Sequence, residues 1–557
     1  MAGYVLRRSA LSLAFLGGLL AAGGAVLLAW GAPLWVPVVL AVVVVGGQYA
    51  IAPHVIQWLI PAYEIPYRDG RYDTRGYATP QPVADLVERR CLEAGLQPVR
   101  LGIIDDGTPN AFTFGHTRSN ARIYVSRGLI DRLDERELDA VVSHEVGHVR
   151  HNDVLVMAIA ATVPIVLYYV YLVLRDSRQQ STVVPAIVGY VGYLLSQLVV
   201  LSLSRARELG ADHYSCRVTE DGDALCSALV RIGYGMGQVD AEREARAREV
   251  GRSKDRDAQK AMAKEQRRAQ RLRAAGVLGI ADHQQAVTVL AAAERGLDGR
   301  EVLGALRWDS CNPWARFSQL FSTHPLIVRR IAALEDSGLP GAPTRWSARE
   351  VAESCRSEDL GRAHRRFWVE LVVRYAPWIA AVVALVAWSR DDFLLLVQAA
   401  AATGVALFVR TLFRCPPGPA STDTRITLLL ARLDASPVTG LPVQVRGRVT
   451  GRGMPGYVLS PDVVVQDESG FLPVLHLQPW PFARTFFGLL RVPDLLDQDV
   501  VVRGWYRRTP GPVLELHSLV PERGRTVRGF QWVGAYVLSV VLALAGGAAW
   551  AFLPLAG

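Results

Sequence analysis

The sequence predicts a mainly α-helical integral membrane protein with a small sheet and a small C-terminal β-barrel domain. Half of the residues are hydrophobic and only 20% are charged, whereas soluble chains carry about 25% charged residues. Several apolar stretches are long and uncharged, and the hydrophobic period changes to two residues late in the chain. At about 150 residues per domain, 557 residues allow two to four compact units.

Five apolar stretches are long enough to cross a hydrocarbon layer of about 30 Å, which needs roughly 20 helical residues. They are residues 9–30, 34–60, 154–174, 182–203 and 529–557. Two shorter stretches, 375–389 and 393–409, predict a marginal transmembrane hairpin. We therefore expect a multi-pass protein of the cell membrane, in contact with the lipid bilayer.

Arginines beside these stretches predict the orientation. They precede the first stretch, follow the second and precede the last: Arg7, Arg8, Arg68, Arg71, Arg75, Arg523, Arg525 and Arg528. Positively charged loops stay in the cytoplasm, so the polar segment 61–153 is expected on the cytoplasmic side. Arg175 and Arg178 lie in a loop assigned to the outer side and point the other way.

The polar regions between the apolar stretches differ in their predicted secondary structure, and the first of them is residues 61–153. In the first one, the sequence predicts strands at 99–104 and 121–125 and helices at 86–94 and 135–150. Residues 240–275 are so charged that they lack an apolar stripe, which indicates a solvated helix or mobile insertion, with an interaction arm as the alternative.

Residues 437–522 alternate between apolar and polar side chains. Short strands are predicted at 443–449, 462–466, 471–477, 499–506 and 513–519. Five such strands indicate a small antiparallel barrel, similar to the fold that binds oligonucleotides and oligosaccharides. No residue pattern in this region indicates catalysis.

The segment His144-Glu145-Val146-Gly147-His148 places two imidazoles one helical turn apart, where they can share a metal ion. Asp134 is a suitable N-cap, with Glu137 in the third helical position. Glu145 lies beside the metal face, where a carboxylate can take a proton from water that zinc activates. The alternative is a surface helix with two solvated histidines.

A catalytic zinc ion needs three protein ligands and an open position. Glu208 and Asp212 follow the stretch 182–203, and an apolar hairpin returns the chain to the membrane face that it left after His148. Glu208 is thus the candidate third ligand, and Asp212, one turn further, is placed to hold a ligand imidazole. The alternative is a surface pair with Arg205 and Arg207.

Four segments in this order resemble the M48 family of integral-membrane zinc metallopeptidases, which includes HtpX-like and CAAX prenyl proteases. They are TPNAFTFG at 108–115, HEVGH at 144–148, SRARELGAD at 204–212 and STHPL at 322–326, and the resemblance covers residues 1–340. It implies a helical, gluzincin-type catalytic domain with a small sheet, and one zinc ion per chain. His144, His148 and Glu208 would be the ligands, Glu145 the general base and Asp212 the group that orients a histidine.

The resemblance also places Asn110 near the substrate cleft and His324 in a supporting position, although His324 is equally explained by its place before a helix. His151, Asp153 and His213 are interpreted as surface or supporting groups, with His151 and Asp153 on the same helix as the motif. An extended peptide would pair with the edge of the strand 121–125.

The predicted domains follow from these assignments. They are residues 1–60 for two transmembrane helices, 61–153 and 204–345 for the two parts of the catalytic domain, 154–203 for a transmembrane hairpin, 346–415 for a linker and the marginal hairpin, 437–522 for the β domain, and 529–557 for a last transmembrane helix. The predicted function is a membrane-embedded endopeptidase that cleaves membrane or membrane-proximal proteins. A CAAX-type processing protease and a non-proteolytic zinc-containing scaffold are the alternatives.

The net charge and the cysteines indicate which partners and which compartment to expect. The net charge of +9 is dispersed beside apolar runs, so we expect no nucleic acid as a partner. The six cysteines have no C-x-x-C spacing, which suggests neither a thiolate zinc site nor a disulfide framework, and a reducing compartment is expected.

Overall fold

A computed structural model describes the chain in ten ranges. These are residues 2–29, 35–75, 81–176, 183–233, 306–355, 357–390, 392–418, 423–452, 460–509 and 511–552. The charged insertion predicted at 240–275 lies outside the described residues. The chain divides into two compact units: Met1–Val239 with Phe317–Arg349 belongs to the first, and Val287–Arg316 with Glu350–Gly557 to the second. Each unit is described by itself.

The described residues contain six helices that are long and apolar enough to span a membrane, together with a shorter apolar helix at Ala10–Ala25. The six are Val42–Leu59, Asp153–Asp176, Val184–Thr219, Leu360–Trp388, Phe393–Arg414 and Gln531–Ala551. The protein is therefore a mainly helical, multi-pass membrane protein. The hairpin predicted as marginal consists of two helices that are each long enough to span a membrane. The first is longer than predicted, since it extends on the N-terminal side through charged residues such as Glu370 and Arg374.

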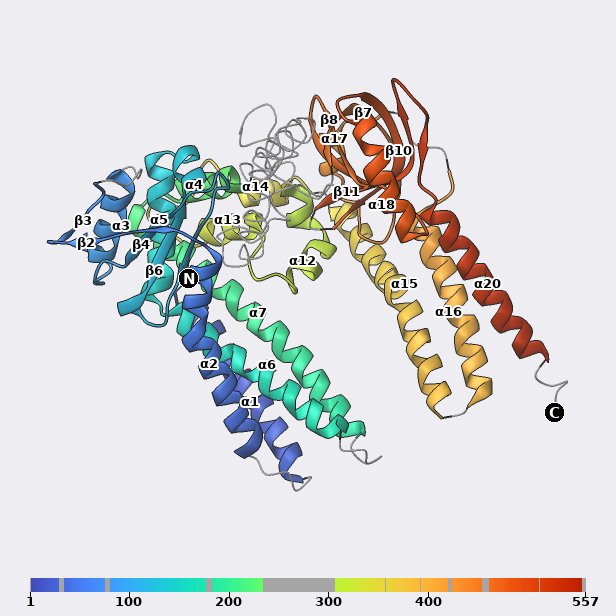
Figure 1. Ribbon diagram of the computed structural model, residues 1–557, viewed down its shortest axis with the longest axis horizontal. Helices are drawn as coiled ribbons and strands as arrows, with labels where there is room; N and C mark the ends of the chain where they lie inside the picture. The colour runs from blue at the N-terminus through green and yellow to red at the C-terminus, as the bar shows by residue number, and fades with distance from the viewer. Residues whose placement is uncertain are drawn as a thin grey trace. The chain divides into compact units, whose positions relative to one another are not determined.

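Four helices of the first unit run together from the sheet, as Figure 1 shows. They are α1 (Ala2–Ala29), α2 (Trp35–Leu59), α6 (Asp153–Asp176) and α7 (Val183–Thr219). α1 and α6 both pack along α7, and α2 packs on α6. Leu16, Leu167 and Leu203 lie in the buried cluster between them. A Cβ at Gly23 would approach Leu167 to 2.8 Å, so glycine permits this close packing.

A four-stranded sheet precedes the motif helix. Its order is β1 (Tyr63–Ile65), β4 (Arg100–Ile104), β6 (Arg122–Ser126) and β5 (Ala111–Phe114). β4 and β6 are parallel, and the other neighbours are antiparallel. The strand predicted at 121–125 exists as β6, but the prediction that its edge is free was wrong, because β4 and β5 pair with its two sides. The edge strands are β1 and β5, and β5 is the one that packs on α5.

Helix α5 (Glu135–Arg150) carries the motif, and its predicted cap is confirmed. The Asp134 side chain accepts from the Glu137 amide, and the Glu137 side chain accepts from the Asp134 amide. α5 packs on α7, on β5 and on α3 (Gln81–Glu93). α7 continues from its apolar part into this layer, so the membrane helix itself delivers residues 204–212 to the motif.

The shorter elements of the first unit surround this core. They are β2 (Tyr67–Arg68), β3 (Arg71–Tyr72), the 3₁₀ helix η1 (Arg118–Asn120), α4 (Arg127–Arg132) and α13 (Ile327–Glu335). α13 packs on α7. Two further helices, α12 (Pro313–Gln319) and α14 (Ala348–Glu353), lie where the chain passes between the units.

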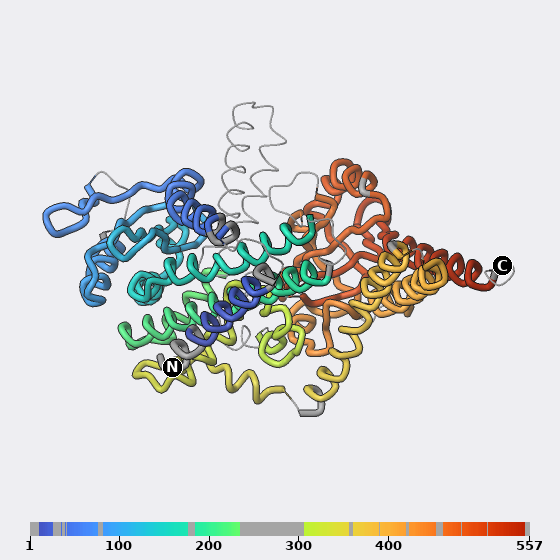
Figure 2. Tube along the Cα trace, turned by 90° about the horizontal axis from the view of Figure 1, so that it is seen from below, coloured from blue at the N-terminus to red at the C-terminus, as the bar shows by residue number. Residues whose placement is uncertain are grey.

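The second unit combines a strand ring with three apolar helices, α15 (Ser357–Ser389), α16 (Phe393–Arg414) and α20 (Gln531–Phe552), which Figure 2 shows close together beside the ring. The ring strands are β7 (Leu441–Arg452), β8 (Val463–Asp467), β9 (Gly470–Leu475), β10 (Asp499–Arg508) and β11 (Pro512–Pro521), and β12 (Val527–Arg528) adds to β11. The pairing order is β10-β7-β8-β9-β11, and β10 also pairs with β11, so the five strands close on themselves.

All five predicted strands are present. The prediction of a fully antiparallel set was wrong at one pairing, because β9 and β11 are parallel. This pairing arises because the chain leaves β9 through α18 (Pro481–Leu490) and α19 (Val492–Leu495), neither of which was predicted, and forms β10 before β11. A short helix, α17 (Ile426–Leu430), packs on β9.

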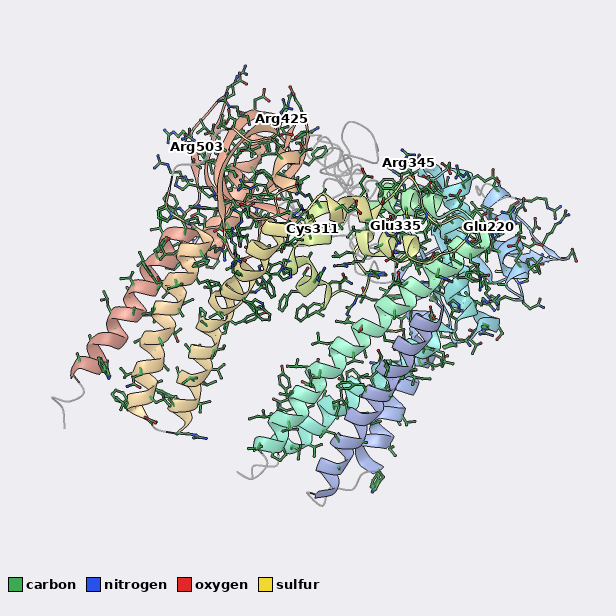
Figure 3. All side chains as sticks on the ribbon, turned by 180° about the vertical axis from the view of Figure 1, so that it is seen from behind. Glu220, Cys311, Glu335, Arg345, Arg425 and Arg503 are labelled. Atoms are coloured by element: carbon green, nitrogen blue, oxygen red, sulfur yellow. A yellow bond between two sulfur atoms is a disulfide. The ribbon has the colours of Figure 1, made fainter. Side chains whose placement is uncertain are left out.

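A disulfide joins Cys311 and Cys355, 44 residues apart, and Figure 3 marks Cys311 in the helical part of the chain. The cysteine spacing had suggested no disulfide framework. The helix at 306–311 and the turn after α14 bring the two sulfurs together, which no local motif encodes. Cysteine usage therefore no longer supports a reducing compartment.

Candidate metal centre

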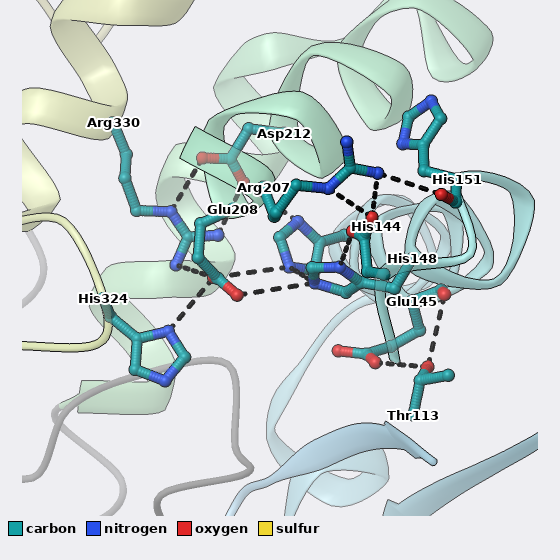
Figure 4. Close-up of polar contacts among 11 residues, drawn as sticks. Thr113, His144, Glu145, His148, His151, Arg207, Glu208, Asp212, His324 and Arg330 are labelled. Carbon is teal, nitrogen blue, oxygen red and sulfur yellow. Dashed lines mark hydrogen bonds and ion pairs between the residues drawn. The ribbon is translucent and has the colours of Figure 1, made fainter. Parts of the chain in front are cut away.

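Helix α5 presents His144 and His148 to the same buried space. Leu138, Val141 and Val142 are buried in the core, which fixes the rotation of the helix. The two Nε2 atoms, one turn apart, lie 3.1 Å from each other. Figure 4 shows both rings directed toward α7.

Glu208 on α7 completes a group of three side chains that could hold a metal ion. Its carboxylate oxygens lie 3.5 Å from His148 Nε2 and 3.8 Å from His144 Nε2. Ligand atoms about 2.0–2.1 Å from a tetrahedral zinc ion are separated by about 3.3–3.4 Å. The separations of 3.1, 3.5 and 3.8 Å therefore fit one ion that contacts all three side chains.

Each ligand histidine has a carboxylate at its other ring nitrogen. Asp212 Oδ1 lies 2.9 Å from His144 Nδ1, and Asp153 Oδ2 lies 2.6 Å from His148 Nδ1. A carboxylate favours the tautomer with the proton on the nearer nitrogen. Both Nε2 atoms then present lone pairs toward one another and toward Glu208. Three electron pairs that converge on one point form a site for a cation.

Two arginines hold these carboxylates. Arg330 of α13, which is only 1% exposed, donates from Nε to Asp212 at 2.8 Å. Arg207 pairs with Asp153 and also donates to the His151 carbonyl at 3.0 Å. With Glu145 and Glu208, the cluster contains four carboxylates and two guanidinium groups. When both imidazoles are neutral, as metal ligation requires, two negative charges remain, which a divalent cation would neutralise.

The electrostatics of His148 reflect this excess of negative charge. Burial alone would disfavour the imidazolium, but Asp153, Glu208 and Glu145 outweigh burial and raise the pKa of His148 to about 9. His151, by contrast, caps α5 outside the cluster. Burial lowers the pKa of His151 to about 4, so that ring is neutral at physiological pH.

Glu145 points away from the three ligands toward the sheet. Its carboxylate is buried, and Thr113 of β5 donates a hydrogen bond to it at 2.7 Å. The Thr113 hydroxyl also lies 3.2 Å from the Glu145 carbonyl, so the edge strand and the motif helix are tied at this residue. Glu145 therefore lies between the metal ligands and the free edge of β5, as Figure 4 shows.

His324 approaches the cluster from the other side. Its Nδ1 lies 3.1 Å from Glu208 Oε2, and both side chains are largely buried. Arg205 of α7 donates to the carbonyl of Ser322 at 2.7 Å and thereby holds the segment that carries His324. Asn110 lies at the start of β5, where its backbone amide and carbonyl both bond Ser126. Within the described residues, Asn110 makes no hydrogen bond or ion pair with His144, His148 or Glu208.

Comparison with known proteins agrees with this geometry. The model of peptidase family M48 matches residues 81–337. The protease HtpX homolog of Methanothermobacter thermautotrophicus is 31% identical over 192 residues, which cover 34% of this chain and 70% of that protein. The chain belongs to peptidase family M48.

Other M48 relatives align over a smaller share of their length. The protease HtpX homolog of Acidiphilium cryptum is 38% identical, and the alignment covers 28% of this chain and 56% of that protein. The protease HtpX homolog 1 of Saccharolobus solfataricus is 32% identical, and the alignment covers 34% of this chain and 64% of that protein. The chain thus spans between about half and 70% of the relatives it matches. The crystal structure of S. mikatae Ste24p aligns over 42% of this chain and 58% of that one, with 17% identity and a TM-score of 0.27, which is too low to argue from.

Arg330 and Thr113, which lie around the M48 motif, were given no role from the sequence, whereas Asp153 was interpreted as a surface or supporting group. Asp153 was placed on the motif helix, but that assignment was wrong: α5 ends at Arg150, and α6 begins at Asp153 after Asn152, whose φ is +55°. Asparagine tolerates this left-handed conformation, which ends a helix. Asn152 followed by an acidic residue was therefore the signal in the sequence that a new helix begins at Asp153. Arg330 and Thr113 reach the site only through packing of α13 and β5, and no spacing rule would have found them.

Proposed function

We propose that this M48 protein is a zinc-dependent endopeptidase that hydrolyses membrane or membrane-proximal proteins. The observation that carries the proposal is the convergence of His144, His148 and Glu208 on one point, with Glu145 beside it on the same helix. Three protein ligands leave one coordination position open, which is the arrangement of catalytic rather than structural zinc.

Held by His144, His148 and Glu208, a zinc ion would supply a Lewis acid for the scissile carbonyl and for a water molecule. Glu145 accepts the proton of the attacking water and then delivers it to the leaving amine. Thr113 holds one oxygen of Glu145, which leaves the second oxygen for this proton transfer. Asp212 and Asp153 hold the two ligand imidazoles in the tautomer that the ion requires.

The free edge of β5 suggests how a peptide is held. β5 pairs with β6 on one side and is tied to Glu145 through Thr113. An extended substrate would add as a strand to the open side, since backbone hydrogen bonds need little sequence specificity. Asn110 at the start of β5 and His324 beside Glu208 are proposed to contact the substrate near the scissile bond.

The arginines flanking the apolar helices favour a cytoplasmic catalytic unit. A non-proteolytic scaffold would have no use for a buried carboxylate beside the ligands, and no observation favours a CAAX substrate. The closed ring of five short strands fits a small barrel of the oligonucleotide- and oligosaccharide-binding type, which we propose as the fold of the C-terminal domain.

The test compares membrane fractions from cells that carry the wild type or Glu145→Ala. We expect substrates to accumulate intact in the variant, and purified Glu145→Ala to retain zinc while it loses peptidase activity. His144→Ala serves as the matched control, because it should lose both. Equal proteolysis by wild type and Glu145→Ala, at equal zinc content, would contradict the proposal.

A further inference from the structure

Helix α18 exposes an apolar face that the strand ring does not cover. The face consists of large side chains with high exposed fractions: Trp480 73%, Phe482 79%, Phe486 61%, Leu489 47% and Leu490 62%. At 3.6 residues per turn, the four positions inside the helix fall within roughly 100° of arc. A stripe of this width on a helix predicts contact with an apolar phase.

The opposite face of α18 is fixed to the ring. Phe487 stacks on the buried ring of His476, with 3.7 Å between the centroids. Arg452 of β7 donates to the Gly488 carbonyl at 2.7 Å. Val492 and Leu495 of α19, directly after it, are also buried. The helix is therefore held in one rotation, and its apolar stripe points away from the ring.

The start of α18 lies at the end of a membrane helix. The Gln531 amide, at the first residue of α20, bonds the Leu477 carbonyl, and a Cβ at Gly534 would meet Pro479 at 3.1 Å. The Tyr536 hydroxyl donates to the Cys415 carbonyl at 3.1 Å, so α16 ends beside the first turns of α20. The stripe begins within a few residues of these anchors, and Figure 1 shows α18 beside the ends of α16 and α20 that lie next to the ring.

Charged and aromatic groups of the same region suit a membrane surface. Arg491 follows α18, and Arg528, whose carbonyl accepts from Gln478, precedes α20; both side chains are exposed. Phe530 beside them is 49% exposed. Aromatic rings are enriched at the water–lipid boundary, and basic residues bind anionic lipid headgroups there.

We propose that α18 is an interfacial membrane helix, whose apolar stripe enters the bilayer surface that α16 and α20 cross, with Arg491 and Arg528 on lipid phosphates. Such helices bury their apolar face about 5–10 Å into the boundary between headgroups and acyl chains. The helix thereby fixes the C-terminal ring against the membrane. The opposite end of the ring, where Arg425 and Arg503 project in Figure 3, stays in water.

The test uses the full-length protein in vesicles of phosphatidylcholine and phosphatidylglycerol, labelled with a fluorophore at Phe486→Cys. Leu489→Cys is a second variant on the stripe, and Arg503→Cys is the exposed control. Both stripe positions are exposed, so the substitutions remove nothing from the core. Four native cysteines are buried and two are disulfide-bonded, and the labelled wild type measures their background.

At both stripe positions we expect stronger quenching by a nitroxide near the lipid headgroup than by one deep in the acyl chain, and protection from aqueous iodide. The control should show the reverse accessibility. Iodide quenching at 486 and 489 equal to that at 503 would overturn the proposal. So would protection from both iodide and nitroxide lipids, because a protein surface would then cover the stripe. In vesicles where phosphatidylcholine replaces phosphatidylglycerol, the nitroxide quenching should be weaker. Unchanged quenching would refute the binding of anionic lipid by Arg491 and Arg528.

Discussion

Replacing Glu208 by glutamine tests the third metal ligand with little change in shape. In the structure this carboxylate lies 3.5 and 3.8 Å from the two Nε2 atoms, and it is the only anionic member of the ligand group. A neutral amide is a much poorer ligand for a divalent ion that already has two neutral imidazoles. We therefore expect Glu208→Gln to weaken zinc binding strongly.

The size of the loss in zinc affinity can be estimated from the number of ligands. Zinc sites with four protein ligands bind with about 10–16 kcal/mol, which is roughly 2.5–4 kcal/mol per ligand. Because about 1.4 kcal/mol corresponds to a tenfold change, the loss of one ligand should weaken binding by about 10²–10³-fold. Asp212→Asn keeps all three ligands but alters the partner of His144, so a loss of roughly 10 to 100-fold is expected.

The assay is competition for zinc with a chromophoric chelator, followed by metal analysis after dialysis. Peptidase activity is measured on the same samples, and Glu145→Ala serves as a control with unchanged ligands. The order of affinities is the decisive result. Full zinc content and full activity in Glu208→Gln would refute the ligand assignment and would make His324 the next candidate, since it lies 3.1 Å from the same carboxylate.

Three further predictions concern the base, the orientation and the C-terminal ring. Glu145→Gln should lower kcat by at least about 10²-fold at unchanged zinc content, as loss of a general base does; retained turnover would contradict its role. A reporter in the loop at Pro340 should be shielded from membrane-impermeant reagents in intact cells, and labelling there would reverse the orientation. Burial lowers the pKa of His476 to about 4, below its unfolded value of about 6.5. The ring should therefore lose stability as the pH falls from about 6.5 to 4, by on the order of 3 kcal/mol, and His476→Phe should lose less in urea-dependent proteolysis.

Local patterns in the sequence were sufficient for the apolar helices, for the motif helix α5 and for the spacing of the histidine pair. Hydrophobic length predicted the apolar helices, and the capping pair Asp134 and Glu137 placed the start of α5. The spacing of His144 and His148 placed both imidazoles on one face. Each of these signals joins residues a few positions apart, and short-range geometry fixes such relations before the chain packs.

Tertiary structure alone decided the remaining features. Arg330 reaches Asp212 across 118 residues, β5 rather than β6 forms the free edge beside Glu145, and β9 pairs in parallel with β11 after two unpredicted helices. Cys311 and Cys355 likewise meet only in the folded chain. These relations depend on which surfaces pack together after the elements form, because partners far apart in sequence are selected by shape and burial. The sequence alone therefore predicted which side chains could hold a metal, and packing determined which groups surround and orient them.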